Sequence, residues 1–335
     1  METEPREGEN KVFKLSMPTQ PRESMSRIIF SDDLKQYLNN LPDLELDLLL
    51  EAYERSLPEG FRVNTLKLSE EEVLQRLKEK GFRIKKIPWA RYGYVAENGE
   101  DLGKTIEHML GLIYMQGPIS MTPVEVLDPK PGEIVLDLCA APGSKSTQIA
   151  QLLEGRGVVV ANDISYDRIK ALSSNLQRFG VLNCVITLAD GRRYPKFARN
   201  LFDKVLIDAP CSSLGIISKD WGIAKSWSLK LVDRLSKLQQ QLILAGYDCL
   251  KPGGVLVYST CTLTIEENEF VVNSLLEKRE NARIEEAELP GLKFRKGFVE
   301  FKGVRLQEDL GKTMRIMPYD NWAEGFYIAK IVKEG

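Results

Sequence analysis

The 335-residue chain contains a single histidine, and this scarcity limits the chemistry available to it. A Ser-His-Asp or Cys-His catalytic group would depend on His108 alone. No C-x-x-C motif occurs, so there are too few ligands for a zinc site, and we expect no bound metal. The five cysteines, an odd number without close pairing, are typical of reduced thiols. An activated cysteine in this chain would have to gain its reactivity from something other than an imidazole.

Long apolar runs are also absent. No stretch approaches the roughly 18 apolar residues that a membrane-spanning helix needs. The first residues, Met-Glu-Thr-Glu-Pro-Arg-Glu-Gly, are too acidic and polar for a signal peptide. We therefore expect a cytoplasmic protein that does not associate with membranes. We also expect it to be a monomer.

An excess of positive charge is missing too, because acidic residues outnumber basic ones by 48 to 46. This balance weakly disfavours a nucleic-acid partner, but two local stretches favour one. The first interleaves three cations with three aromatic residues: Lys85, Lys86, Arg91, Trp89, Tyr92 and Tyr94. The second collects five cations: Lys293, Arg295, Lys296, Lys302 and Arg305. Such runs are usually solvated faces, but cations among aromatic rings suit single-stranded RNA, whose bases stack while its phosphates are neutralised.

Composition and hydrophobic periodicity divide the chain into three segments. Residues 1–25 are polar, contain prolines and lack periodicity, so we expect a loose tail. Residues 26–115 are expected to form a small helical and α+β module, and residues 116–335 the main domain. In the module, a helical pattern over 31–53 breaks at Pro42. Ser69-Glu-Glu-Glu72 is a capping box that opens a helix ending at Gly81, between strands expected at 61–67 and 82–87.

The main domain alternates short buried strands with helices of 10 to 20 residues. Strands are expected at 134–138, 157–161, 184–188, 204–207 and 255–258, and helices at 144–153, 165–178 and 228–250. This alternation predicts a doubly wound α/β fold with a mostly parallel sheet covered on both faces. A last strand at 326–332 is expected to pair antiparallel at or near a sheet edge.

In such sheets ligands bind beyond the carboxyl ends of the strands. The first strand is followed by Asp137-Leu-Cys-Ala-Ala-Pro-Gly-Ser-Lys-Ser146, whose small residues let a ligand approach the backbone. The loop has neither the G-x-G-x-x-G nor the Walker pattern, which disfavours dinucleotides and ATP. Acids follow the next three strands. Asp163 is suited to hold two ribose hydroxyls, Asp190 to accept from an adenine amino group, and Asp208 to face a reacting centre. The alternative is that one or two of them merely cap helices or turns.

Three motifs together resemble the RNA cytosine-5 methyltransferase family, which includes RsmB/Fmu and the NOL1/NOP2/Sun proteins. They are Asp137-Leu-Cys-Ala-Ala-Pro-Gly-Ser-Lys, Asp208-Ala-Pro-Cys-Ser-Ser213 and Tyr258-Ser-Thr-Cys-Thr262. The resemblance extends outward through Arg62-Val-Asn-Thr65, the segment 116–132, Arg315, Pro318 and Glu324-Gly-Phe-Tyr327, so that it runs from about residue 60 to the C-terminus. Ser144 stands where the family commonly has a second glycine, a variation seen among its tRNA-modifying members.

The resemblance implies a Rossmann-like class I methyltransferase core with an antiparallel last strand, preceded by an RRM-like module that positions RNA. It implies S-adenosyl-L-methionine as the cofactor and RNA as the partner, with tRNA favoured and rRNA as the alternative. The cofactor contacts implied are Cys139, Ala140, Ala141, Pro142, Gly143, Ser144, Lys145, Asp163, Arg168, Asp190 and Asp208.

Cytosine C5 is too poor a nucleophile to take a methyl group directly. A thiolate that adds at C6 makes C5 nucleophilic, which divides one hard step into two easier ones. The resemblance implies Cys261 as this nucleophile, Cys211 as an aid to product release, and Asp208 as a contact to the target base. It also implies Lys145 in the active site, where its ammonium could lower a thiol pKa or polarise the base. The thiols of Cys139, Cys184 and Cys249 are expected to be small buried apolar groups.

Four other functions predict different residues at these positions. DNA cytosine-5 methyltransferases use a Pro-Cys after the fourth strand as nucleophile, and Pro210-Cys211 fits that pattern, but the Ser-Thr-Cys-Thr stretch around Cys261 favours RNA. A cofactor-binding RNA scaffold without activity would be expected to have lost a cysteine or an acid. A nicotinamide-dependent oxidoreductase would have the glycine fingerprint. An amino-methyltransferase would have Asn/Asp-Pro-Pro-aromatic where this chain has Asp208-Ala-Pro-Cys211.

Overall fold

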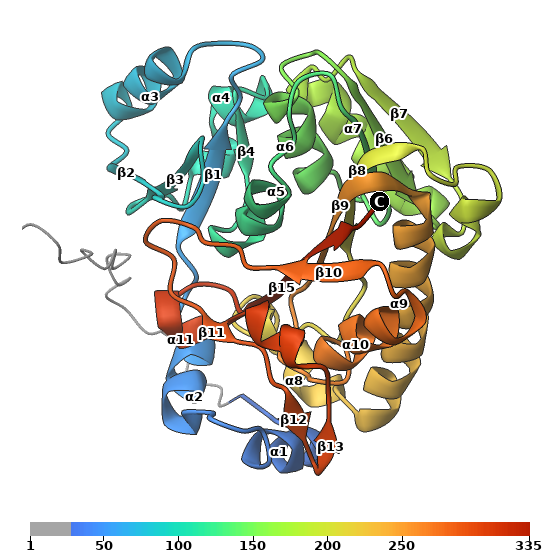
Figure 1. Cartoon of the computed structure of the whole chain (residues 1–335). Helices are drawn as coiled ribbons and strands as arrows, with labels where there is room; N and C mark the ends of the chain where they lie inside the picture. Colours follow the sequence, from blue (N-terminus) through green and yellow to red (C-terminus); the bar gives the residue numbers. More distant parts are fainter. Residues whose placement is uncertain (1–27) are drawn as a thin grey trace, which may run out of the picture.

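The computed structural model describes residues 28–335, and the tail expected for residues 1–25 lies outside the described residues. A nine-stranded sheet forms the centre of the molecule, in the order β11-β14-β15-β9-β8-β5-β6-β7, with β10 also paired to β15 (Figure 1). Its parallel strands are β5 (Ile134–Asp137), β6 (Val158–Asp163), β7 (Cys184–Leu188), β8 (Phe202–Asp208) and β9 (Leu250–Thr260). The prediction of a doubly wound, mostly parallel sheet is confirmed.

The antiparallel last strand is confirmed as β15 (Phe326–Lys333), which pairs with β9. Further strands lie beyond it: β10 (Ala282–Glu285), β11 (Arg295–Lys296) and β14 (Met314–Ile316). The sequence did not reveal them, because two to four residues are too few to show a period of two.

Helices cover both faces of this sheet, and alternate residues of one strand supply the two cores. Val135 of β5 packs in a cluster with Ile149 of α6 (Ser144–Leu152) and Leu172 of α7 (Tyr166–Phe179). Its neighbour Leu136 packs in the other cluster, with residues of α9 (Leu229–Cys249) and α10 (Glu269–Lys278). The remaining short elements of this domain are α5 (Thr122–Leu127), α8 (Gly222–Ser226), α11 (Pro318–Asn321), β12 (Glu300–Phe301), β13 (Val304–Arg305) and the 3-10 turns η2 (Ile119–Met121), η3 (Gly191–Lys196), η4 (Leu214–Ile216) and η5 (Glu308–Lys312).

A second, four-stranded sheet precedes this core. Its elements are β1 (Glu59–Val63), α3 (Glu70–Glu79), β2 (Ile84–Lys86), β3 (Gly93–Ala96), the turn η1 (Leu102–Lys104), α4 (Ile106–Met109) and β4 (Ile113–Met115). The order β2-β3-β1-β4, with all neighbours antiparallel, is the βαββαβ topology of an RRM-like module. The capping box predicted at Ser69 is confirmed, since its hydroxyl accepts from the Glu72 N–H and the Glu72 carboxylate accepts from the Ser69 N–H.

The helices before this module pack elsewhere. Ser31 caps α1 (Asp32–Asn39), and the predicted break at Pro42 separates it from α2 (Leu46–Glu54). Both helices share a hydrophobic cluster with Leu214 and Leu263, which belong to the main domain. In Figure 1 they lie at the end of the molecule away from α3 and β1–β4.

The RRM-like sheet is buried on both faces. Phe61 and Tyr94 stack, with ring centroids 5.7 Å apart, in the core under α3. On the opposite face, Val95 joins the main-domain cluster, and a Cβ on Gly93 would lie 2.7 Å from the Met121 sulfur, so only glycine permits this approach. Arg62 of β1 is also buried there. The face that ordinary RRMs use to stack bases is therefore a contact surface within this chain.

Arg62 joins the two domains. Its guanidinium donates to Gln151 and, over 2.7 Å, to Thr147, both on α6, and to the Ser144 carbonyl oxygen at 3.2 Å. Burial lowers its pKa to about 9. Within residues 28–335 no helix is both long enough and apolar enough to cross a membrane.

Candidate active site

The strand order brings the predicted site residues into one row. Because β9, β8, β5, β6 and β7 are parallel neighbours, their carboxyl ends meet at the same edge of the sheet. Asp137, Asp163 and Asp208 are the last residues of β5, β6 and β8, while Asp190 follows β7 and Cys261 follows β9. The loop from residue 138 to 143 lies in the middle of this row.

The loop after β5 leads into α6 through Gly143, whose φ of +107° is a conformation that other residues rarely adopt. A Cβ there would also lie 3.0 Å from Leu172. The Ala140 N–H donates to the Asn162 carbonyl, and the Ala141 N–H donates to Asp163 over 3.3 Å. The loop is thereby held against the end of β6.

Asp163 is buried and organises its surroundings. One carboxylate oxygen accepts from the Ser165 N–H at 2.9 Å, and the other lies 3.2 Å from the Arg168 guanidinium, which also donates to the Ala141 carbonyl. The structure thus brings Asp163 and Arg168 to the loop, as the resemblance implied.

For Asp190, the structure shows the alternative role that the sequence left open, which is to cap a helix or turn. It caps η3 by accepting from the Arg192 N–H, and its carboxylate also pairs with the Arg192 guanidinium at 2.7 Å. These hydrogen bonds lower its pKa. The side chain lies at the predicted edge, but capping alone accounts for its contacts in this structure.

Asp137 is the most perturbed carboxyl group in the row. It is fully buried, one oxygen accepts from Ser146 at 2.7 Å, and the other has no hydrogen-bond partner within residues 28–335. Burial, together with the charge of Asp208, raises its pKa to about 7. A buried acceptor without a partner is costly, so this atom marks a place where a ligand or a proton is needed.

Lys145 and Asp208 form an ion pair across the same edge. The Lys145 Nζ lies 2.7 Å from Asp208 Oδ2, and Ser259 donates to the other carboxylate oxygen at 2.8 Å. Nζ also donates to Ser120 and lies 5.5 Å from the centre of the Phe326 ring. The Lys145 side chain is 7% exposed and that of Asp208 30%, so the carboxylate is the member of the pair that a ligand can reach.

Two thiols complete the row. Cys211 Sγ and Cys261 Sγ lie 3.3 Å apart as free cysteines, and Ser213 Oγ lies 3.6 Å from Cys261 Sγ. The two sulfurs share a hydrogen bond, which lowers the pKa of Cys261 although burial and the charge of Asp208 oppose the shift. The same hydrogen bond, with burial, raises the pKa of Cys211. The thiolate is therefore favoured on Cys261, the cysteine singled out in the sequence.

Lys145 contributes to this shift in the expected direction. Its ammonium lowers the pKa of Cys261, but it is paired with Asp208 and lowers the pKa less than the hydrogen bonds of Cys261 do. The hydrogen bonds that Cys261 shares with Cys211 and Ser213 lower its pKa more.

The other three cysteines lie away from this pair. Cys249 is fully buried, and Cys139 and Cys184 pack against hydrophobic clusters. Burial raises the pKa of all three thiols, to about 12 for Cys184 and Cys249. Cys249 therefore matches the expected buried thiol, whereas the residues Cys139 and Cys184 are only partly buried, and an unreactive role stays a prediction for all three.

The first basic stretch does not form the surface that its sequence suggested. Trp89 and Tyr94 are buried, because the module needs them in its cores. Lys86 pairs with Glu70 at 3.0 Å, and Arg91 pairs with Glu125 at 2.9 Å. Rings that are buried in this way cannot stack on the bases of an RNA strand.

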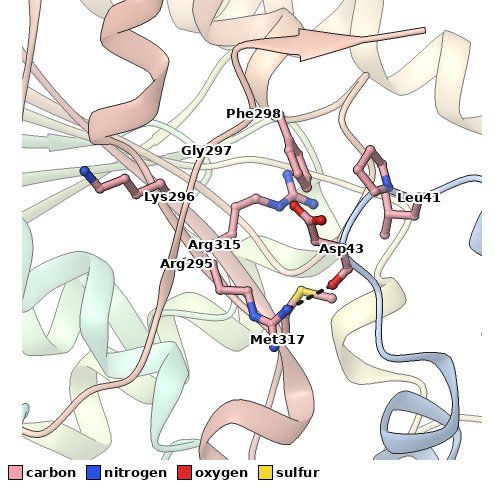
Figure 2. Close-up of a pocket in the computed structure, with 9 residues that line it drawn as sticks. Leu41, Asp43, Arg295, Lys296, Gly297, Phe298, Arg315 and Met317 are labelled. Carbon is pink, nitrogen blue, oxygen red and sulfur yellow. Dashed lines mark hydrogen bonds between the residues drawn. The ribbon is translucent and has the colours of Figure 1, made fainter.

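The second basic stretch is neutralised in a similar way. Arg295 pairs with Glu45 at 2.6 Å and with Asp320 at 3.2 Å, and Arg305 pairs with Glu308 at 2.7 Å. A cavity of about 270 Å³ lies beside Arg295, between Leu41 and Phe298 (Figure 2). The two arginines in its wall, Arg295 and Arg315, are each paired with a carboxylate.

Residues 28–335 contain no cluster of three side chains that could ligate a metal ion.

Comparison with known proteins decides the family. A family model described as 16S rRNA methyltransferase RsmB/F matches residues 124–332, and one for the N-terminal domain of RsmF matches residues 30–118. The chain belongs to the RsmB/F family of RNA cytosine-C5 methyltransferases. This RsmB/F methyltransferase is 47% identical over 281 residues to a tRNA (cytosine(49)-C(5))-methyltransferase of Pyrococcus abyssi, covering 83% of the chain and 89% of that relative.

Other relatives of this RsmB/F methyltransferase are longer. It is 40% identical to the ribosomal RNA small subunit methyltransferase F of Vibrio parahaemolyticus, over 87% of the chain but 60% of that protein. It is also 40% identical to a mouse 28S rRNA (cytosine-C(5))-methyltransferase, over 90% of the chain but 38% of that protein.

Two solved structures share the fold over nearly the whole chain. A methyltransferase homologue from Pyrococcus horikoshii superposes with a TM-score of 0.82 at 36% identity, covering 92% of the chain and 96% of the homologue. NSun6 from Pyrococcus horikoshii, described as solved with SFG, superposes with a TM-score of 0.79 at 26% identity, covering 92% and 99%.

Proposed function

We propose that this methyltransferase forms 5-methylcytosine in tRNA, with S-adenosyl-L-methionine as methyl donor and Cys261 as the nucleophile. The observation that carries the proposal is the asymmetric pair of thiols, in which Cys211 lies 3.3 Å from Cys261 and favours the thiolate there. The identity of 47% to a tRNA enzyme favours tRNA. The rRNA enzymes among the relatives make rRNA the second candidate.

The edge of the sheet fits the proposed cofactor. Gly143 opens the loop where a side chain would intrude, and Asp137 presents a buried oxygen without a partner. We assign cofactor binding to the loop from residue 139 to 145, to Asp163 and Arg168 for the ribose side, to Asp190 for the adenine side, and to Asp208. When bound, S-adenosylmethionine supplies an electrophilic methyl group.

The residues of the chain would perform the remaining chemistry. The Cys261 thiolate adds to C6 of cytosine, and the new C–S bond makes C5 nucleophilic. Asp208, which is exposed enough to reach the base, accepts hydrogen bonds from it, while Lys145 holds Asp208 in place. After C5 is methylated, its proton leaves to a base and the C6–S bond breaks, returning the thiolate to Cys261. Cys211 assists this release, since its thiol lies against the sulfur that departs.

RNA would approach along the joint between the domains. A cleft of about 430 Å³ is lined by Glu59 and Gly60 of the RRM-like module and by Lys219 and Glu324 of the main domain. Lys219 Nζ lies 2.9 Å from Glu324, and the charge of Cys261 contributes to raising its pKa, which places Lys219 near the thiols. We propose that Lys219 contacts a phosphate beside the target base, and that residues 26–115 position the strand.

The proposal extends to location and assembly. We propose a cytoplasmic monomer, because all the cysteines of the chain are free thiols, as is typical of a reducing compartment. Size-exclusion chromatography and cell fractionation would check the two statements.

The test is methylation of separate tRNA and rRNA pools in vitro, followed by bisulfite mapping. We expect 5-methylcytosine in tRNA, and its absence from both pools would refute the function. Cys261→Ala should abolish methylation and the adduct, whereas Cys211→Ala should accumulate a covalent RNA–protein adduct that survives denaturing electrophoresis. A DNA-type enzyme would show the reverse, with Cys211→Ala losing the adduct and Cys261→Ala retaining it.

A further inference from the structure

The turn before α10 places one carboxyl group in contact with both loops that carry the thiols. Glu267 is fully buried, and its side chain accepts hydrogen bonds from four donors. One oxygen accepts from the Ser212 N–H at 2.9 Å and from the Gln239 side-chain amide at 3.0 Å. The other accepts from the Ser212 and Thr264 hydroxyls, the latter at 2.8 Å. Four donors form a full partner set for a carboxylate in a dry site.

These donors come from both cysteine loops. Ser212 is adjacent to Cys211, and Thr264 is three residues after Cys261. The Gln239 amide, from α9, also donates to the Pro210 carbonyl at 2.8 Å, so it holds the start of the Cys211 loop. One carboxyl group thus connects two loops that leave different strands, and the distance of 3.3 Å between the sulfurs depends on these loops.

Glu267 also acts on the thiols by its charge. It contributes to raising the pKa of Cys211, after the hydrogen bond to Cys261 and burial. The other titratable groups facing the thiols are Lys145 from α6, Asp208 from β8, Lys219 after η4 and Tyr258 from β9. The two lysines and Asp208 act on Cys261, whereas Glu267 lies on the Cys211 side.

We propose that Glu267 is a positioning residue of the two-thiol site: it holds both cysteine loops at contact distance and keeps the shared proton on Cys211. Cys261 is thereby left as the thiolate. This inference rests on the proposed function for its purpose, but the distribution of the proton can be measured without RNA.

The substitution Glu267→Gln separates the effect of the negative charge from the effect of the hydrogen bonds. In Glu267→Gln, the amide oxygen can keep the two donors that cannot reverse, the Ser212 N–H and the Gln239 amide. The new NH2 group then faces the two hydroxyls, which can accept instead of donating. Glu267→Gln therefore removes the charge and preserves the hydrogen-bonded frame. Glu266→Gln is the matched control, since Glu266 bonds to Tyr37 at 2.6 Å and not to the cysteine loops.

The experiment is substoichiometric alkylation of the full-length protein with iodoacetamide from pH 6 to pH 10, with each cysteine quantified by peptide mass spectrometry. In the unmodified sequence, Cys261 should react at least about tenfold faster than Cys211 at pH 7.5, a ratio that corresponds to about two pKa units because a thiolate of lower pKa is intrinsically less nucleophilic. Glu267→Gln should reduce this preference by about tenfold or more, and Glu266→Gln should leave it unchanged. A thermal melt of each variant establishes that it is folded.

Two results would overturn the proposal. One is a preference for Cys211 in the unmodified sequence, which decides the matter even where Glu267→Gln does not fold. The other is a folded Glu267→Gln protein that still alkylates Cys261 over Cys211 in the same ratio as the unmodified sequence. That result would show that the charge of Glu267 does not keep the proton on Cys211. Absence of RNA methylation would refute the proposed function but leave the alkylation result standing, so the two failures are distinguishable.

Discussion

The hydrogen bond between the two cysteines makes a quantitative prediction about Cys211→Ala. The alanine removes the thiol that donates to Cys261 over 3.3 Å, so the pKa of Cys261 should rise. A hydrogen bond to a charged group contributes about 1.5–3 kcal/mol. Since one pKa unit equals about 1.4 kcal/mol, the expected rise is about one to two units. The weakness of S–H as a donor favours the lower end of that range.

The assay is the pH at which Cys261 reaches half its maximal alkylation rate. This midpoint is preferable to the rate at one pH, because a thiolate of higher pKa is intrinsically more nucleophilic and partly offsets its lower abundance. Cys211→Ser should restore part of the shift by providing a hydroxyl donor. Cys184→Ala, which removes a thiol on the edge strand β7, four positions from β9 in the strand order, should leave the midpoint unchanged. An unchanged or lower midpoint in Cys211→Ala would refute the reasoning.

Three further predictions concern other parts of the structure. Arg62→Met should lower the free energy of unfolding by about 2–4 kcal/mol in urea titrations, because it leaves buried partners on α6 unsatisfied; a loss below about 0.5 kcal/mol would contradict this. The raised pKa of Asp137, about 7, means that the folded state holds a proton that the unfolded state releases above about pH 4. Stability from this group is therefore present at low pH and lost as the pH rises through 7, and Asp137→Asn should remove that loss when unfolding at pH 5 and pH 8 is compared. Lys219→Ala should raise the KM for RNA more than it changes kcat, and should reduce the slope of log affinity against log salt by about one; an unchanged slope would place Lys219 away from phosphate.

The sequence was sufficient to locate those site residues that lie at the ends of strands. Strand periodicity and the residue after each strand were enough to bring Asp137, Asp163, Asp208 and Cys261 to one edge, because parallel strands allow no other arrangement. The role of Asp190 was less determined, since a strand-end acid serves equally well as a cap, and here it caps η3.

Glu267 could not be found in this way. It lies in a turn, in the run Ile265-Glu-Glu-Asn268, where nothing distinguishes it from Glu266. Its importance arises from α9, which brings Gln239 beside it, and from the loop that brings Ser212. A partial signal existed in the hydroxyl-rich stretch around Cys261, since Thr264 needs an acceptor once it is buried.

For the basic and aromatic stretch near residue 90, the sequence indicated a role in RNA binding that the structure does not support. Its composition suggested an exposed RNA surface, but composition does not tell whether a ring faces solvent or a neighbouring domain. Trp89 donates its indole N–H to the Pro118 carbonyl at 3.0 Å inside the domain joint. That contact depends on how the module docks, which no local pattern specifies.

The docked RRM-like sheet changes how mutations in this module should be interpreted. In a free RRM, replacing a ring on the central strands weakens RNA binding and leaves folding nearly intact. Here the face that would carry such rings holds Arg62 and Val95, which are buried against the main domain, so their replacement would be measured as reduced abundance and early melting rather than as altered sequence preference. A variant of this module found in a genetic screen would therefore report on protein turnover first, and on RNA recognition only once its stability had been restored.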